Sequence, residues 1–141
     1  MQLADTSAWS WSRHTTRPEL RTGFDELVQD GEIATCDMVR LELLYSVRNA
    51  AEFDETLADL DSLPTCPIRE AQWKRSIWVY GELARQGGAH QRSVKHPDLL
   101  VAAAAEAIGI PVLHYDQDFE RIASLTGQPH RWLAKRGSLR S

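Results

Sequence analysis

MQLADTSAW at residues 1–9 and IPVLHYDQDF at residues 110–119 share one pattern, a short apolar run that ends in an aspartate. The runs predict buried strands, so Asp5 and Asp116 stand at strand ends. Each aspartate could simply cap the helix or turn that follows it. Each could also be a carboxylate held at the edge of a sheet, where parallel α/β folds form their sites.

Short apolar stretches alternate with helical patterns along the rest of the chain. LLVAAAAEAIG at residues 99–109 is apolar nearly all round, which indicates a deeply buried helix. The alternation predicts an α/β fold in a single domain over residues 1–141, with a central parallel sheet of four to five short strands flanked by helices on both faces. The predicted strands are residues 2–5, 33–36, 65–68, 110–114 and 131–133, and the predicted helices are residues 18–30, 37–48 (capped by Asp37), 52–63, 69–86, 97–109 and 118–125.

Length and composition exclude several classes of protein. A chain of 141 residues that is 43% hydrophobic can bury one proper core, and it has no apolar run of about 18 residues that could cross a membrane. Cys36 and Cys66 match no metal-binding spacing and the N-terminus lacks a secretion signal, so we expect reduced, buried thiols in a cytoplasmic protein. The formal net charge of −4 argues against a general electrostatic coat for nucleic acid.

Basic residues nevertheless gather locally. Residues 83–97 contain no acid but include Arg85, Arg92 and Lys95. A solvated basic face explains this stretch, and so does a local surface that binds phosphate groups.

Five acidic residues lie at or near predicted strand ends or on the apolar sides of predicted helices, where an acid is not usually expected. They are Asp5, Glu42, Asp98, Asp116 and Asp118. Taken one at a time, the aspartates could cap helices or complement helix dipoles, and Glu42 could face solvent. If they converge, their mutual repulsion requires a cation, and oxygen-only ligands favour Mg²⁺ or Mn²⁺. An acidic centre that holds Mg²⁺ suits phosphoryl chemistry. Glycine-rich nucleotide-binding loops and the GxSxG motif of serine hydrolases are absent from the sequence.

Four motifs together resemble a known family. LADTSAW, the glutamate within VRLELLYS, PDLLVAAAA and YDQDF resemble the PIN-domain ribonucleases and, more narrowly, the VapC toxins of bacterial toxin–antitoxin pairs. The resemblance spans the whole chain and implies a PIN-like fold and a Mg²⁺-dependent endoribonuclease, in which Mn²⁺ can substitute. Water would attack an RNA phosphodiester and leave 5′-phosphate and 3′-hydroxyl ends.

The resemblance also implies roles for individual residues. The family's four catalytic acids match Asp5, Glu42, Asp98 and Asp116, and a more variable fifth acid matches Asp118. Mg²⁺ would be held mainly by Asp5 and Asp98, with Asp116 and Asp118 as further ligands. The small hydroxyl residues that support the first aspartate match Thr6 and Ser7. Arg85, Arg92 and Lys95 could guide the RNA backbone.

Two kinds of partner follow from the same resemblance. We expect a cognate VapB-like antitoxin that inserts an arginine-containing segment among the acids, and we expect a homodimer. The helices of residues 52–86 could offer a groove for a partner helix, although core packing explains the same apolar side chains, which are Phe53, Leu57, Trp73, Ile77 and Tyr80. Alternatives to a nuclease are a catalytically inactive interaction module and a receiver-like or phosphatase-like phosphotransfer domain.

Overall fold

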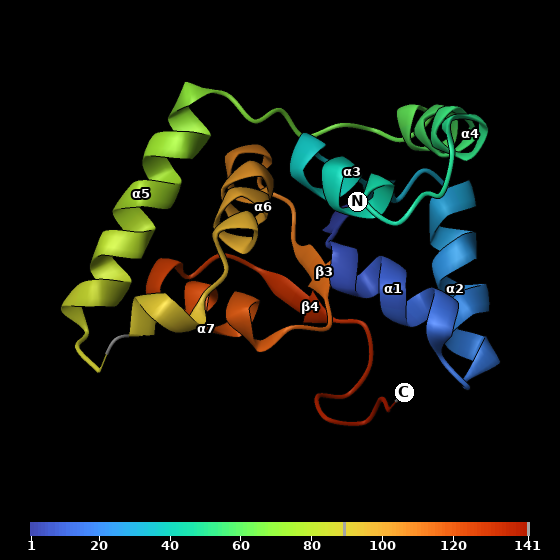
Figure 1. The fold of residues 1–141 in the computed structure, drawn as a ribbon. Coiled ribbons are helices and arrows are strands. Elements are labelled where there is room, and N and C mark those ends of the chain that lie inside the picture. The colour runs from blue at the N-terminus through green and yellow to red at the C-terminus, as the bar shows by residue number, and fades with distance from the viewer. Residues whose placement is uncertain (89, 141) are drawn as a thin grey trace.

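Four short parallel strands form the centre of the protein (Figure 1). The structure is a computed structural model, which describes residues 1–88 and 90–140. The strands lie in the order β2-β1-β3-β4. This arrangement confirms the predicted parallel α/β sheet. The strands are β1 (Gln2–Ala4), β2 (Ile33–Ala34), β3 (Val112–His114) and β4 (His130–Trp132).

Helices connect and cover the strands. Five helices have bounds within two residues of those predicted, at residues 18–30, 52–63, 69–86, 97–109 and 118–125. The helix predicted at residues 37–48 is shorter than expected and ends at Leu44. The helices are α1 (Thr6–His14), α2 (Pro18–Gln29), α3 (Asp37–Leu44), α4 (Ala50–Asp61), α5 (Glu70–Arg85), α6 (His96–Ile108) and α7 (Gln117–Thr126), with a 3-10 helix η1 (His90–Ser93) before α6.

The structure corrects three local predictions. Helix α1 was not predicted, because Ser and Trp alternate in TSAWSWSRH and hide its apolar face. The strand predicted at residues 65–68 is reduced to an isolated bridge between Thr35 and Thr65, since Pro64 precedes the segment and Pro67 lies within it. Asp37 is the first residue of α3 and does not cap it, because Cys36 occupies the cap position.

Helix α6 is the centre of the core. Every residue from Asp98 to Ala105 is buried, and the helix packs against β1 and β3. Its four consecutive alanines keep the helix narrow, so that α5 packs closely on its other side. In Figure 1, α5 lies on one flank of α6 and α1 with α2 on the opposite flank. The helix therefore carries Asp98 into the interior.

The strand order places the ends of β1 and β3 together. From β1 the chain goes to β2 on one side, and it later returns past β1 to β3 on the other side. Leu3 of β1 pairs with Ala34 of β2 and with Val112 of β3. The crevice beyond the carboxyl ends of the strands at such a reversal is where open α/β sheets bind their ligands.

Two further expectations concern the cysteines and the membrane. Cys36 and Cys66 are both free thiols and both buried, as predicted. Burial raises the pKa of each thiol to about 11, which disfavours the reactive thiolate. Within residues 1–88 and 90–140, no helix is both long enough and apolar enough to cross a bilayer.

Candidate functional site

Asp5 stands directly after β1, and its two carboxylate oxygens differ in their hydrogen bonds. Its Oδ2 accepts hydrogen bonds from the backbone N–H of Ser7 at 3.1 Å and from Ser7 Oγ at 2.8 Å, so Asp5 does cap α1. Its Oδ1 is buried and has no hydrogen-bond partner in the described part of the chain. The residue is only 3% exposed. One oxygen therefore anchors a helix, and the other is left for a ligand.

Ser7 connects this aspartate to the next strand. While its hydroxyl donates to Asp5, it accepts a hydrogen bond from the backbone N–H of Tyr115 at 2.8 Å. Tyr115 follows β3 directly. The hydroxyl thus fixes the end of β1 against the end of β3.

Glu42 reaches the same region from α3. Its Oε1 accepts a hydrogen bond from Thr6 Oγ1 at 2.9 Å. The charge of Glu42 is close enough to that of Asp5 to raise the pKa of Asp5. Ser7 thus supports Asp5 as predicted, but the prediction for Thr6 is corrected, because its hydroxyl donates to Glu42 and not to the first aspartate.

The end of β3 carries the second pair of aspartates. Asp116 caps α7 by accepting a hydrogen bond from the backbone N–H of Asp118 at 2.9 Å. The backbone N–H of Asp116 donates to Nδ1 of the buried His114 at 3.1 Å. His114 lies 2.9 Å, Nε2 to Nδ1, from His130 on β4. The loop that presents Asp116 is therefore fixed from both sides.

Three of the predicted acids form one cluster. Asp98, Asp116 and Asp118 each offer an oxygen, and these oxygens lie within 4.8 Å of one another. Asp5 is outside this group of three, but its charge raises the pKa of Asp98. Glu42 thus neighbours Asp5, and Asp5 neighbours the cluster of three aspartates. We call these five acids together the acidic centre.

Lys95 lies in the acidic centre as well. Its Nζ is 2.7 Å from Asp116 Oδ2, 3.0 Å from Asp118 Oδ2 and 3.4 Å from Asp98 Oδ2. The hydrogen bonds to Asp116 and Asp118 raise the pKa of the lysine above its ordinary value, against the effect of burial. Lys95 is the residue before α6, so it stands three positions before Asp98 and on the same side of that helix.

The surroundings of the acids shift their pKa values in opposite directions. Burial, with repulsion from Glu42, raises the pKa of Asp5 to about 6. Burial, repulsion from Asp5 and a hydrogen bond shared with Asp118 raise the pKa of Asp98 to about 9. The pKa of Asp118 is lowered, because hydrogen bonds from Asp98 and Lys95 outweigh its burial. Without a metal, the ammonium group of Lys95 reduces the negative charge of the acidic centre.

The acidic centre fits a hard divalent cation. All its candidate ligands are carboxylate oxygens, which Mg²⁺ and Mn²⁺ prefer. Asp5 Oδ1 and Asp98 Oδ2 are buried and make no hydrogen bond within the described residues, although Asp98 Oδ2 has the charge of Lys95 at 3.4 Å. Buried carboxylate oxygens without hydrogen bonds are costly, and a cation would compensate for that cost.

The three predicted RNA-binding residues have different surroundings. Arg85 is exposed and pairs with Glu82 on the same helix at 2.9 Å. Arg92 is exposed in η1. Of the three, Lys95 alone contacts the acidic centre within the described chain. The prediction that they guide RNA stays a prediction.

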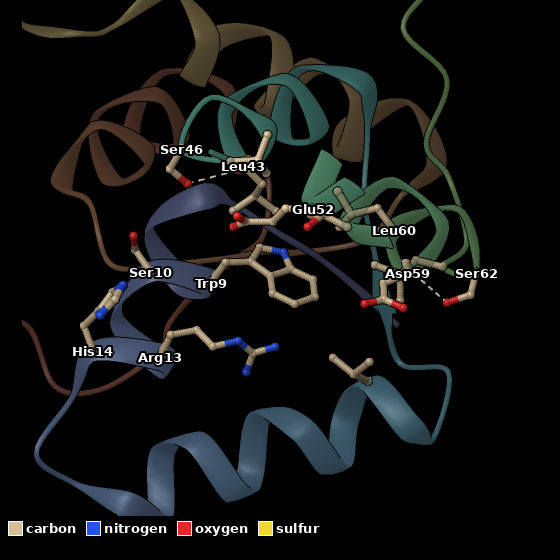
Figure 2. Close-up of a pocket in the computed structure, with 14 residues that line it drawn as sticks. Trp9, Ser10, Arg13, His14, Leu43, Ser46, Glu52, Asp59, Leu60 and Ser62 are labelled. Carbon is tan, nitrogen blue, oxygen red and sulfur yellow. Dashed lines mark hydrogen bonds between the residues drawn. The ribbon is translucent and has the colours of Figure 1, made fainter. Parts of the chain in front are cut away.

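Two cavities lie away from the cluster of aspartates. The larger, of about 720 Å³, lies among α1, α2, α3 and α4. Figure 2 shows Trp9 at its centre, with Arg13 and His14 at one side and Asp59 at the other. The second, of about 430 Å³, is lined by residues of α1 and α3, and Glu42 is one of them.

Three of the five apolar residues proposed as a partner groove are exposed. Trp73 and Ile77 of α5 are 56% and 71% exposed, and Phe53 of α4 is also exposed. Tyr80 and Leu57 are partly buried. Core packing is therefore the wrong explanation for Phe53, Trp73 and Ile77, and a partner surface stays a prediction.

Sequence reasoning missed the position of Lys95 and the bridging role of Ser7. A signal for Lys95 was present, because a helix that begins near Pro97 puts residues 95 and 98 on one side of its first turn. No comparable signal existed for the contact between Ser7 and Tyr115, which depends on how β1 and β3 pair.

Comparisons with known proteins identify the family of the chain. The family model of the PIN domain matches residues 3–125. Ribonuclease VapC18 of Mycobacterium tuberculosis is 43% identical over 135 residues, 96% of each chain. Ribonuclease VapC51 of the same organism is 35% identical over 137 residues, 97% of this chain and 96% of its own.

Solved structures show the same fold. The DNA-bound VapBC complex of Salmonella typhimurium contains a chain with a TM-score of 0.67 and 19% identity, which covers 95% of this chain and 100% of that one. A chain of VapBC-5 from Mycobacterium tuberculosis, a toxin–antitoxin system, has a TM-score of 0.55 and 23% identity, with 93% and 95% coverage. The resemblance read from the four sequence motifs is thus confirmed: this chain belongs to the PIN-domain family, among the VapC proteins.

Proposed function

We propose that this chain is a Mg²⁺-dependent endoribonuclease and the toxin of a toxin–antitoxin pair. The observation that carries the proposal is the acidic centre, in which Asp98, Asp116 and Asp118 bring carboxylate oxygens within 4.8 Å of one another. Its relatives VapC18 and VapC51 are named ribonucleases. Buried acids with raised pKa values, such as Asp5 and Asp98, are also typical of catalytic sites.

The chain's own residues would divide the work between binding and proton transfer. Asp98, Asp116 and Asp118 would hold the ion together with Asp5, whose Oδ1 makes no hydrogen bond within the described residues. When bound, the ion supplies positive charge that stabilises the phosphate in the transition state and makes water more acidic. Mn²⁺ would serve in place of Mg²⁺, because it accepts the same oxygen ligands.

Glu42 would act on the attacking water. It is only partly buried, and Thr6 fixes its carboxylate next to Asp5. It can orient the water or accept its proton as the new P–O bond forms. The bond between phosphorus and the 3′ oxygen would break, and the departing 3′ oxygen would take up a proton from solvent, which leaves 5′-phosphate and 3′-hydroxyl ends.

A cleavage assay with purified protein tests the proposal. Single-stranded RNA should be cut with Mg²⁺ or Mn²⁺ and left intact in EDTA. Asp98→Asn should reduce the cleavage rate by about 100-fold or more. Even the mutation of a residue that only hydrogen-bonds to a metal ligand lowers metal affinity or activity by about 10- to 100-fold. Asp54→Asn, which changes an exposed aspartate on α4, is the matched control and should cut at the wild-type rate. Equal cleavage by the Asp98 variant, or full activity in EDTA, would contradict the metal site.

The antitoxin is the second part of the proposal. The similar chains from Salmonella typhimurium and Mycobacterium tuberculosis are parts of VapBC assemblies. We propose that a VapB-like antitoxin inhibits this chain by inserting an arginine among Asp5, Asp98 and Asp116. A guanidinium group pairs with two carboxylate oxygens at once, which suits a site that already holds the ammonium of Lys95.

A binding measurement tests the antitoxin contact. Asp98→Asn should weaken the complex, and added Mg²⁺ should weaken the wild-type complex by competition. Equal affinity for both proteins, with no effect of Mg²⁺, would place the inhibitory contact elsewhere. Sedimentation of the toxin alone tests the predicted homodimer in the same preparation.

A further inference from the structure

Lys95 makes an unusual set of contacts for an exposed side chain. Its ammonium group lies between 2.7 and 3.4 Å from oxygens of Asp116, Asp118 and Asp98, yet the side chain is 61% exposed. Its backbone N–H also donates to Asp118 Oδ2 at 3.0 Å. The main chain of Lys95 is therefore fixed at the acidic centre, while its side chain reaches the carboxylates from the solvent side.

The ammonium group uses the same oxygens as the cation proposed above. Asp98, Asp116 and Asp118 are the three residues whose oxygens lie within 4.8 Å of one another, and Lys95 contacts all three. Carboxylates at that separation repel one another strongly in a partly buried site. One positive charge offsets part of the repulsion. A divalent ion would offset more of it, because it carries twice the charge.

A lysine is suited to leave such a site. Its ammonium group is a compact charge on a flexible four-carbon stem, and it is strongly hydrated when it returns to water. The exposed stem of Lys95 has solvent on its open side, so the group can withdraw without disturbing the core. An arginine with two fixed hydrogen bonds to each partner would be harder to displace.

We propose that Lys95 is a built-in counter-ion of the acidic centre, which occupies the three carboxylates in the absence of metal and is displaced from them when a divalent ion binds. The inference rests on the proposed metal site, and it adds that Lys95 competes with the metal ion for the same three carboxylates. Lys95 thereby stabilises the metal-free protein, and it weakens the apparent affinity for the ion.

The first test compares metal binding by Lys95→Met with binding by the wild type. Titration calorimetry with Mg²⁺ or Mn²⁺, without RNA, should show about threefold to tenfold tighter binding by the variant. The metal-free variant should unfold at a lower temperature than the wild type, and added Mg²⁺ should restore more stability to it than to the wild type. Lys74→Met is the matched control, because Lys74 pairs with one exposed carboxylate, that of Glu70 on α5. This control should bind metal as the wild type does.

The second test uses the wild-type protein, so it does not depend on the variant's folding. An amine-specific reagent is added at increasing Mg²⁺ concentrations, and modification of each lysine is measured by mass spectrometry. Modification of Lys95 should be slow in EDTA and should rise in parallel with metal binding, whereas that of Lys74 should stay constant.

The outcomes separate this inference from the proposed function. In one outcome, metal binds and is needed for cleavage, but the Lys95 variant binds it no more tightly and the labelling of Lys95 does not change with Mg²⁺. That outcome overturns the counter-ion role and leaves the proposed nuclease function supported. If calorimetry detects no metal binding by the wild type, both fail together.

Discussion

Ser7 accepts a hydrogen bond from the backbone N–H of Tyr115 at 2.8 Å, although 108 residues of sequence separate the two. The same hydroxyl donates to Asp5. One small side chain thus sets the distance between the acid after β1 and the loop that carries Asp116. This contact explains why a serine at this position can matter for an acidic site without itself binding a ligand.

Replacing this serine should affect both stability and activity. Ser7→Ala leaves the N–H of Tyr115 without its acceptor and removes a donor from Asp5, which should lower the free energy of unfolding by about 1–3 kcal/mol. RNA cleavage should fall as well, because the ends of β1 and β3 lose their connection. Denaturant unfolding measures the first effect. Ser10→Ala, an exposed serine on the same helix, is the control, and an equally small loss in both variants would contradict the bridging role.

The metal-free protein should lose stability as the pH rises. Folding raises the pKa of Asp5 from its ordinary 3.8 to about 6, so the folded state holds this proton more tightly than the unfolded state. The resulting stabilisation is fully present below about pH 4 and is lost as the pH rises through about 6. Thermal unfolding in EDTA, compared between wild type and Asp5→Asn, isolates this contribution. The variant should show the flatter pH dependence, and identical pH dependence in the two proteins would refute it.

Neutralising Glu42 should separate stability from activity. Glu42→Gln keeps an acceptor for Thr6 and removes a charge that repels Asp5, so the metal-free protein should be as stable as the wild type or more stable. RNA cleavage should nevertheless fall strongly, because an amide cannot accept the proton of water. Melting temperatures and cleavage rates are compared with those of Glu55→Gln, an exposed residue of α4. A marked loss of stability with full activity would show that Glu42 is a structural acid.

The salt dependence of RNA binding should distinguish Arg92 from Lys95. If Arg92 contacts a phosphate, Arg92→Ala should reduce the slope of log affinity against log salt by about 0.7 for single-stranded RNA. In EDTA the ammonium of Lys95 is held by the acids, so Lys95→Ala should change the slope less. Fluorescence anisotropy in EDTA, where the RNA should stay intact, measures both slopes. An unchanged slope for Arg92→Ala would mean that η1 is only a solvated basic surface.

The sequence predicted the sheet and the position of the acids because both depend on short patterns. An apolar run that ends in Asp5 or Asp116 identifies the end of a strand, and a helix that is apolar nearly all round after Asp98 identifies the centre of the core. Parallel strands then bring their carboxyl ends to one edge. These three facts suffice to gather the aspartates, although they do not give the order of the strands.

Other features depend on contacts that no local pattern encodes. Helix α1 follows from the cap that Asp5 provides, while its Ser and Trp residues have only moderate helix propensity. The exposure of Trp73 and Ile77 contradicts the usual meaning of an apolar helix face, because α5 packs on α6 through other residues such as Val79 and Leu83. Which side of such a helix is buried is decided by its neighbours.

The strand order β2-β1-β3-β4 also affects when the acidic centre can exist during synthesis. A ribosome makes Asp5 and Glu42 early, but β3, Asp116 and Asp118 come more than 60 residues after α3 has ended. A nascent chain that has not yet released β3 and α7 therefore lacks part of the carboxylate set. The acidic centre therefore becomes complete only after the segment that carries Asp116 and Asp118 has left the ribosome.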